Sequence, residues 1–149
     1  MSQIKPERVF NGSYSTLWVD DEEMVEATAC TAKITLEKTE VKQTGTLAKG
    51  YKVTGTDGKG NLKQNKISSY FIKKVGDNIK NGKTTVGQIR SKMADPDAAG
   101  AEDILLMGVT FDELTLIDWE AGKLAEEDIP FTFTGFEVLE SVAHSAAIA

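Results

Sequence analysis

The chain has 149 residues, of which 17 are basic and 23 are acidic, so its formal charge at neutral pH is -6. This length is typical of one domain, here residues 1–149, and the charge argues against a protein that grips nucleic acid through its phosphates. The apolar share of 40% and the charged share of 27% exclude wholesale disorder.

The first part of the chain predicts a short strand followed by a long one. Residues 1–13 mix charges, Pro6 and Gly12 without a period, and we expect an N-terminal arm that orders on a partner. Residues 14–19 alternate as a strand does, and Asp20-Asp21 supplies a turn. The next segment, residues 28–41, alternates without Gly or Pro, which predicts a long strand with one solvent-exposed face. Its apolar face would carry Cys30, Ala32, Ile34 and Leu36, and its polar face Thr31, Lys33, Thr35 and Glu37.

The middle of the chain predicts a loop, then a hairpin. Residues 43–50 interrupt the alternation and are bounded by glycines. Asp57-Gly58 is a strong hairpin signal, and residues 61–66 would form the polar return strand.

From Ser68 onward the apolar residues recur with a helical period. Phe71, Val75 and Ile79 are spaced by four residues, which predicts an amphipathic helix. Asn81-Gly82 would end it, because this pair accepts left-handed backbone geometry.

Three more strands are predicted before the last one. Residues 84–93 form the first, and residues 104–111 are apolar on both faces, which favours a central strand. A third, residues 114–119, would follow a turn at Asp112-Glu113 and lead into an acidic loop over residues 120–127.

The closing strand, residues 128–139, has the clearest alternation in the chain. Its apolar face would carry Ile129, Phe131 and Phe133, and its polar face Pro130, Thr132 and Thr134. Residues 141–149 follow as a loose C-terminal tail.

No residue pattern indicates catalysis, a cofactor or a metal. His144 is the only histidine, so a histidine-dependent triad or a multi-histidine metal site cannot be built within one chain. The only cysteine, Cys30, lacks a reactive setting, and we expect it in the core. Asn81-Gly82-Lys83-Thr84 lacks the earlier glycine and the strand-to-helix order of a phosphate-binding loop. We therefore expect a protein that is not an enzyme.

Two further features concern location. Residues 1–10 lack the apolar region of a secretory signal, so we expect synthesis in a cytoplasm. The longest apolar stretch, residues 104–109, is far shorter than the roughly 20 residues of a membrane helix, so no membrane anchor is expected.

Three stretches, in their order and spacing, resemble the tail tube proteins of contractile-tailed phages, particularly PBSX-like defective prophages and phage-tail-like bacteriocins. They are residues 17–24, residues 51–60 with 66–71, and residues 128–138. The resemblance covers residues 14–140. One departure is Asp20-Asp21, where Asp-Gly would be expected, which leaves the tightness of the first turn open.

The resemblance implies a mainly β fold, a β-sandwich or small barrel with one flanking α-helix. It implies homo-hexameric rings that stack into a tube inside a contractile sheath, in a virion tail or tail-like particle made in a bacterial host cytoplasm. The implied partners are the tail sheath protein, a baseplate or tube initiator and a tape-measure protein. DNA would be only passing cargo, and only in a true phage.

Within that resemblance, two sets of residues are candidates for function. The lumen-facing candidates are Thr31, Lys33, Thr35, Glu37, Thr132 and Thr134, unless these positions face outer solvent. The inter-ring contact candidates are Thr44, Gly45, Leu47, Lys49 and Tyr51, unless this segment is simply a mobile loop. The alternative function is that of a small-molecule-binding β-barrel, which would line its interior with apolar residues.

Overall fold

The computed structural model describes residues 3–148. Residues 1, 2 and 149, at the ends of the predicted N-terminal arm and C-terminal tail, lie outside the described residues. The strands are β1 (Ser15–Val19), β2 (Glu22–Glu23), β3 (Ala27–Val41), β4 (Gly50–Asn65), β5 (Val86–Met93), β6 (Glu102–Phe111), β7 (Glu126–Phe133) and β8 (Gly135–Glu140). The helices are α1 (Tyr70–Lys80) and the short α2 (His144–Ala147), which lies within the predicted loose tail. Two short 3-10 turns, Pro6–Arg8 and Gly12–Tyr14, precede β1.

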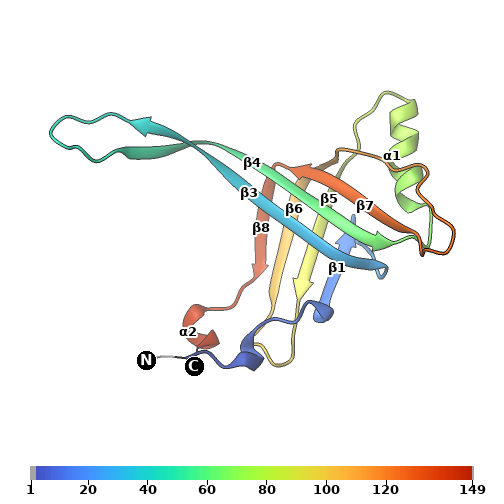
Figure 1. Cartoon of the computed structure of the whole chain (residues 1–149), viewed down its shortest axis with the longest axis horizontal. Coiled ribbons are helices and arrows are strands. Elements are labelled where there is room, and N and C mark those ends of the chain that lie inside the picture. The colour runs from blue at the N-terminus through green and yellow to red at the C-terminus, as the bar shows by residue number, and fades with distance from the viewer. Residues whose placement is uncertain (1–2, 149) are drawn as a thin grey trace.

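All strands belong to one antiparallel sheet in the order β2-β1-β5-β6-β7-β4-β3, with β8 also paired to β6. The prediction of one closing strand over residues 128–139 is wrong, because the chain bends at Thr134 and forms two strands, β7 and β8. β6 pairs with β7 through Phe111 and with β8 through Met107. The long strands β3 and β4 therefore cross the layer of β5, β6 and β8, while α1 lies at one flank (Figure 1). This confirms the predicted mainly β fold with one flanking helix, as an open sheet folded into two layers.

The core lies between these layers. Phe131, Leu62 and Ile89 are its largest fully buried apolar side chains. The predicted apolar face of the closing strand is confirmed, because Ile129 and Phe133 are buried beside Phe131. Such side chains contribute roughly 1.5–3 kcal/mol each when they are removed from water.

Helix α1 covers one end of this core. Phe71 and Val75 are buried, and the Phe71 ring meets the Phe111 ring edge-on with 5.5 Å between centroids. The predicted stop is also confirmed: Gly82 has a φ of +68°, and the N–H of Lys83 donates to the carbonyl of Asn78 at 2.8 Å. Ile79, by contrast, is 60% exposed, so the buried face ends before the last helical turn.

The first hairpin is tight despite its unusual sequence. Asp20 and Asp21 both have positive φ, of 50° and 66°, as a two-residue primed turn requires. The Asp20 carboxylate accepts a hydrogen bond from the backbone N–H of Gln88 at 2.8 Å and forms an ion pair with Lys74. These bonds support a geometry that usually favours glycine, and they settle the open question about this turn.

The predicted hairpin at Asp57-Gly58 is wrong, because β4 runs without a turn from Gly50 to Asn65. The glycines serve a different purpose here. A Cβ on Gly60 would lie 2.5 Å from Cε2 of Phe131, and one on Gly58 would lie 2.8 Å from Cε2 of Phe133. Both glycines let aromatic rings of β7 lie directly against the backbone of β4.

The predicted strand over residues 114–119 is also wrong, since the structure assigns no strand there. The pairing of β6 with β7 ends with a hydrogen bond of 3.0 Å from the N–H of Asp112 to the carbonyl of Pro130. The chain then passes α1, where the Leu114 side chain lies beside Gly76: a Cβ added to that glycine would be 3.7 Å from Cδ2 of Leu114. Ile117 and Trp119 stay exposed, because no neighbouring strand is available to pair with this segment.

A buried carboxylate joins β6 to β5. Asp103 is almost fully buried and accepts two hydrogen bonds from Arg90, at 3.0 Å from Nε and 2.6 Å from Nη2. The guanidinium also stacks on Trp18, 4.7 Å from the ring centroid. The hydrogen bonds from Arg90 lower the pKa of Asp103 below its ordinary value and outweigh the opposing effect of burial.

This pair predicts an acid-dependent loss of stability. A carboxylate whose pKa is lower in the folded chain stabilises it above the unfolded pKa of 3.8, and this contribution disappears as the pH falls through the folded value. We expect Asp103→Asn to lower the thermal midpoint by several degrees at pH 7, with a difference from wild type that shrinks below about pH 4. Thermal denaturation over a pH series measures this. Asp57→Asn, at an exposed carboxylate 3.6 Å from Lys59, should change little at any pH. If the thermal midpoint of wild type exceeded that of Asp103→Asn by the same margin below pH 4, the stabilising role given to the Asp103 carboxylate would be contradicted.

Candidate assembly surfaces

The predicted polar residues of the long strand share one face of the β3-β4-β7 layer. The register places Lys33 opposite Lys59, and Lys59 opposite Thr132. Directly opposed residues point to the same side of a sheet, and successive residues alternate. We call this surface the polar face; it lies away from the core and carries Thr31, Lys33, Thr35, Glu37, Asp57, Lys59, Asn61, Lys63, Asn65, Glu126, Asp128 and Thr132.

The six lumen-facing candidates are therefore brought together with one exception. Thr132 lies in the row of Lys33, and its hydroxyl is 2.7 Å from that of Thr110. Thr134 lies in the bend between β7 and β8, with its hydroxyl 3.5 Å from the carbonyl of Met107. Whether the polar face borders a lumen stays a prediction.

The polar face is nearly neutral. It carries three lysines, Lys33, Lys59 and Lys63, and four carboxylates, Glu37, Asp57, Glu126 and Asp128. Most of the net charge of -6 must therefore come from other parts of the chain.

A long hairpin projects from the body. β4 pairs with β7 only from Gly58 onward, so its earlier residues are bonded to β3 alone. We call residues 36–56 the arm; Figure 1 shows it extending far beyond the rest of the molecule. The predicted loop at its tip is confirmed as the connection over residues 42–49.

The inter-ring candidates lie at or beside this tip. Leu47 is fully exposed and Tyr51 is 61% exposed, while Gly45 adopts a φ of +81°. No residue of the arm is buried. Apolar side chains held this far from a core indicate a surface that something else covers, and the covering partner stays a prediction.

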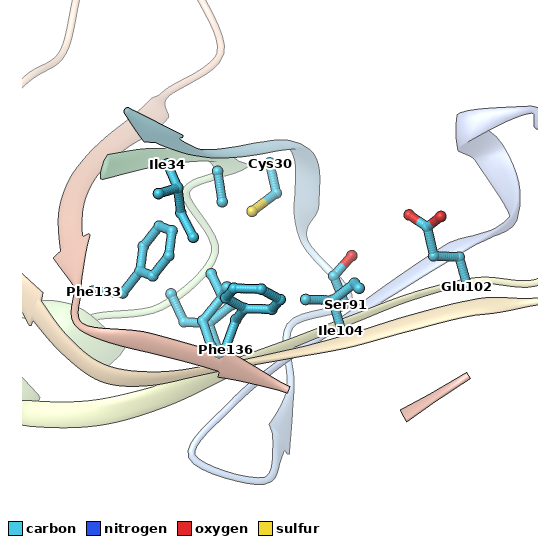
Figure 2. A pocket seen from close by; sticks show the side chains of 10 residues that line it. Cys30, Ile34, Ser91, Glu102, Ile104, Phe133 and Phe136 are labelled. Carbon is cyan, nitrogen blue, oxygen red and sulfur yellow. The ribbon is translucent and has the colours of Figure 1, made fainter. Parts of the chain in front are cut away.

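An apolar groove of about 420 Å³ opens beneath β3. Figure 2 shows Cys30 and Ile34 on β3 pointing across it toward Phe136 and Ile104 on the opposite wall. Ala32 and Leu106 also line it. The apolar face predicted for the long strand therefore faces inward, but onto a groove that one chain leaves open.

The prediction that Cys30 lies in the core is wrong. Its side chain is exposed at the groove wall, because the opposite layer does not reach it. The surrounding groups nevertheless desolvate the thiol and raise its pKa to about 11. At neutral pH this cysteine is therefore almost entirely protonated and a poor nucleophile.

Residues 3–148 carry neither a metal-binding cluster of His, Cys, Asp or Glu side chains nor a membrane-spanning helix. This part of the chain holds no group of three His, Cys, Asp or Glu residues arranged to bind a metal ion. None of its helices is long and apolar enough to cross a membrane.

Comparisons with known proteins agree with one another. The profile of a family described as "Phage tail tube protein" matches residues 2–140. The Phage-like element PBSX protein XkdM of Bacillus subtilis (strain 168) is 29% identical over 142 residues, which cover 94% of this chain and 97% of that protein.

Two solved structures have a similar fold. One, from the sheath/tube terminator of the extracellular contractile injection system PVC, is 11% identical, has a TM-score of 0.71 and covers 91% of this chain and all of that one. Another, from the PVC sheath-tube complex, is 12% identical, has a TM-score of 0.69 and covers 91% of this chain and 95% of that one. At these identities the likeness concerns the fold alone.

Proposed function

This chain belongs to the phage tail tube protein family, and from that premise we propose that six copies close into a ring and that rings stack into a hollow conduit. The chain is thus a structural subunit of a tail tube. The observation that carries the assembly proposal is the pair of long strands β3 and β4, which leave an unpaired sheet edge and an arm without a core of its own.

In this assembly the polar face lines the channel. Thr31, Lys33, Thr35 and Glu37 present short or charged side chains on one surface, as a water-filled barrel interior does. The near balance of lysines and carboxylates on this face suits a passive conduit, because neither sign would hold a charged cargo tightly. Thr134 would lie at the border of the channel surface.

The arm makes the contact between rings. Its tip residues, Thr44, Gly45, Leu47, Lys49 and Tyr51, reach beyond the body and would be covered by the next ring. Burial of the Leu47 and Tyr51 side chains would then stabilise stacking.

The proposed partners follow from the family. They are a tail sheath protein, a baseplate or tube initiator and a tape-measure protein, with DNA as passing cargo in a true phage. The likeness to chains from a sheath-tube complex supports the first of these. The particle would be a virion tail or tail-like particle built in the host cytoplasm, and this subunit would need no catalytic group, cofactor or metal.

One observation favours the alternative of a small-molecule-binding β-barrel, namely the apolar groove beneath β3. A barrel of that kind encloses its ligand, whereas here β3 and β8 each pair on one side only and leave the groove open. An open groove of this kind does not favour the ligand-binding barrel over the tube subunit.

Sedimentation of the purified chain over a concentration series tests this proposal. We expect a species of six times the 16.2 kDa chain mass, and much larger polymers as concentration rises. A chain that stays monomeric at every concentration, even with a baseplate preparation added as nucleus, would rule the proposal out.

A further inference from the structure

The connection between β6 and β7 holds large apolar side chains in solvent. Leu116, Ile117 and Trp119 are 65%, 81% and 77% exposed and lie close together in sequence. Leu114 packs beside α1, but no backbone hydrogen bond among residues 3–148 involves residues 113–119. A group of exposed apolar residues marks a protein contact, and tryptophan is enriched where such contacts gain most of their energy.

The same segment is strongly acidic. We call residues 112–120 the acidic segment; its charged residues are Asp112, Glu113, Asp118 and Glu120. Within residues 3–148, only Glu120 of these four forms an ion pair, with Lys123 at 3.1 Å. A partner that fits this surface therefore combines exposed apolar side chains with positive charge.

The tip of the arm has this composition. The connection over residues 42–49 carries Lys42 and Lys49 and no acidic residue, and Lys52 follows in β4. None of these lysines forms an ion pair with another of the residues 3–148. Leu47 is fully exposed beside them, and Tyr51 is 61% exposed. The tip is thus complementary to the acidic segment in charge, and both are apolar.

The two surfaces lie at opposite ends of the molecule. The last residue of β4, Asn65, pairs with Glu126, and the N–H of Lys66 donates to the carbonyl of Ala125 at 3.0 Å. Figure 1 shows the connection from β6 to β7 beside α1, on the far side of the body from the arm. With 16 residues, β4 is about 50 Å long, so the tip cannot reach the acidic segment of its own chain.

We propose that the tip of the arm docks on the acidic segment of a copy in the adjacent ring. Leu47 and Tyr51 cover Trp119 in this contact, and the tip lysines lie beside Asp118. This inference rests on the proposed function and names the surface that receives the arm. Because the two surfaces differ, each ring keeps free tips on one side and free acidic segments on the other, so that rings add head to tail.

Charge exchange tests the contact. Lys49→Glu and Asp118→Lys should each raise the concentration needed for tubes roughly tenfold, because the change repeats in every copy of a ring. The double variant should return that concentration close to the wild-type value, as sedimentation and negative-stain microscopy measure. Asp97→Lys is the matched control, at an exposed carboxylate in the loop between β5 and β6, and should assemble as wild type does. A double variant no better than the single ones would overturn the contact.

Trp119 gives a direct readout of the same contact. The other tryptophan, Trp18, is half-buried against Arg90, and Trp18→Phe keeps an aromatic ring there while isolating the fluorescence of Trp119. Acrylamide should quench this fluorescence strongly in the monomer and several-fold less in tubes, because the tip covers the indole. If residues 42–49 are also removed, quenching in the rings should stay as strong as in the monomer.

The outcomes separate this contact from the tube itself. Strong quenching of Trp119 in tubes, or protection of Trp119 in rings that lack the tip, would overturn the docking site and leave the tube intact. The acidic segment would then be open to another partner, such as the sheath. A wild-type chain that never forms rings or tubes would overturn the proposed function and this inference with it.

Discussion

Replacing Gly60 with alanine should destabilise the fold by about 3 kcal/mol or more. The added Cβ would lie 2.5 Å from the carbonyl oxygen of Thr31 and 2.5 Å from Cε2 of Phe131. Neither neighbour can give way easily, because the first is backbone of β3 and the second belongs to a fully buried ring. Relief would require β3 or β7 to separate from β4, the strand that joins them.

Denaturant unfolding and soluble yield measure this effect. Gly135→Ala is the matched control, since its Cβ would meet Cε of Met107 at 3.6 Å, an ordinary contact, in a strand of the same sheet. We expect that variant to fold with near wild-type stability. A Gly60→Ala chain with an unchanged unfolding midpoint would show that the packing of Phe131 on β4 is not as described.

Removing the tip of the arm should abolish tubes and leave the fold intact. If an Asn-Gly turn replaces residues 42–49, the pair Val41 and Gly50 can still close the hairpin. Because no residue of the arm is buried, the free energy of unfolding should stay within about 0.5 kcal/mol of the wild-type value. Rings should form, but stacked tubes should be absent in the electron microscope.

A pair of single substitutions sharpens this test. Leu47 at the tip and Leu124 in the loop before β7 are both almost fully exposed. Leu47→Ser should shorten or eliminate tubes, whereas Leu124→Ser should not, since only the first lies at the proposed ring contact. Normal tubes from the chain without residues 42–49 would contradict a stacking role for the arm.

Much of the fold could be predicted from local patterns. Alternation over residues 28–41 predicted the long strand, and alternation over residues 128–133 predicted both faces of β7, because a half-buried strand has a period of two. The break at Thr134, which separates β8 from β7, was not predicted. The fourfold spacing of Phe71 and Val75 predicted α1 and its buried face. These signals are local, so the sequence shows them directly.

The errors arose where a distant partner decides the outcome. Asp57-Gly58 reads as a turn, yet Gly58 and Gly60 admit rings from residues more than 70 positions away in sequence. The apolar segment 114–119 has the composition of a strand and lacks a strand to pair with. Cys30 lies on the predicted apolar face, but one chain alone does not bury it.

The candidate assembly surfaces could also be predicted only in part. Alternation alone predicted that Thr31, Lys33, Thr35 and Glu37 share a face, and the register adds Thr132 to their surface. No period in the sequence identifies which face meets a lumen, because that depends on how copies are arranged. The free edges of β3 and β8 become visible only in the topology, because pairing between strands distant in sequence decides which edges stay open.

Cryo-electron microscopy of the assembled polymer tests the central claim most directly. The account predicts a hollow tube of stacked sixfold rings, with the polar face around Lys33 and Thr35 lining the channel and the arm reaching the adjacent ring. A filament without a channel, or a tube with this face turned outward, would contradict it.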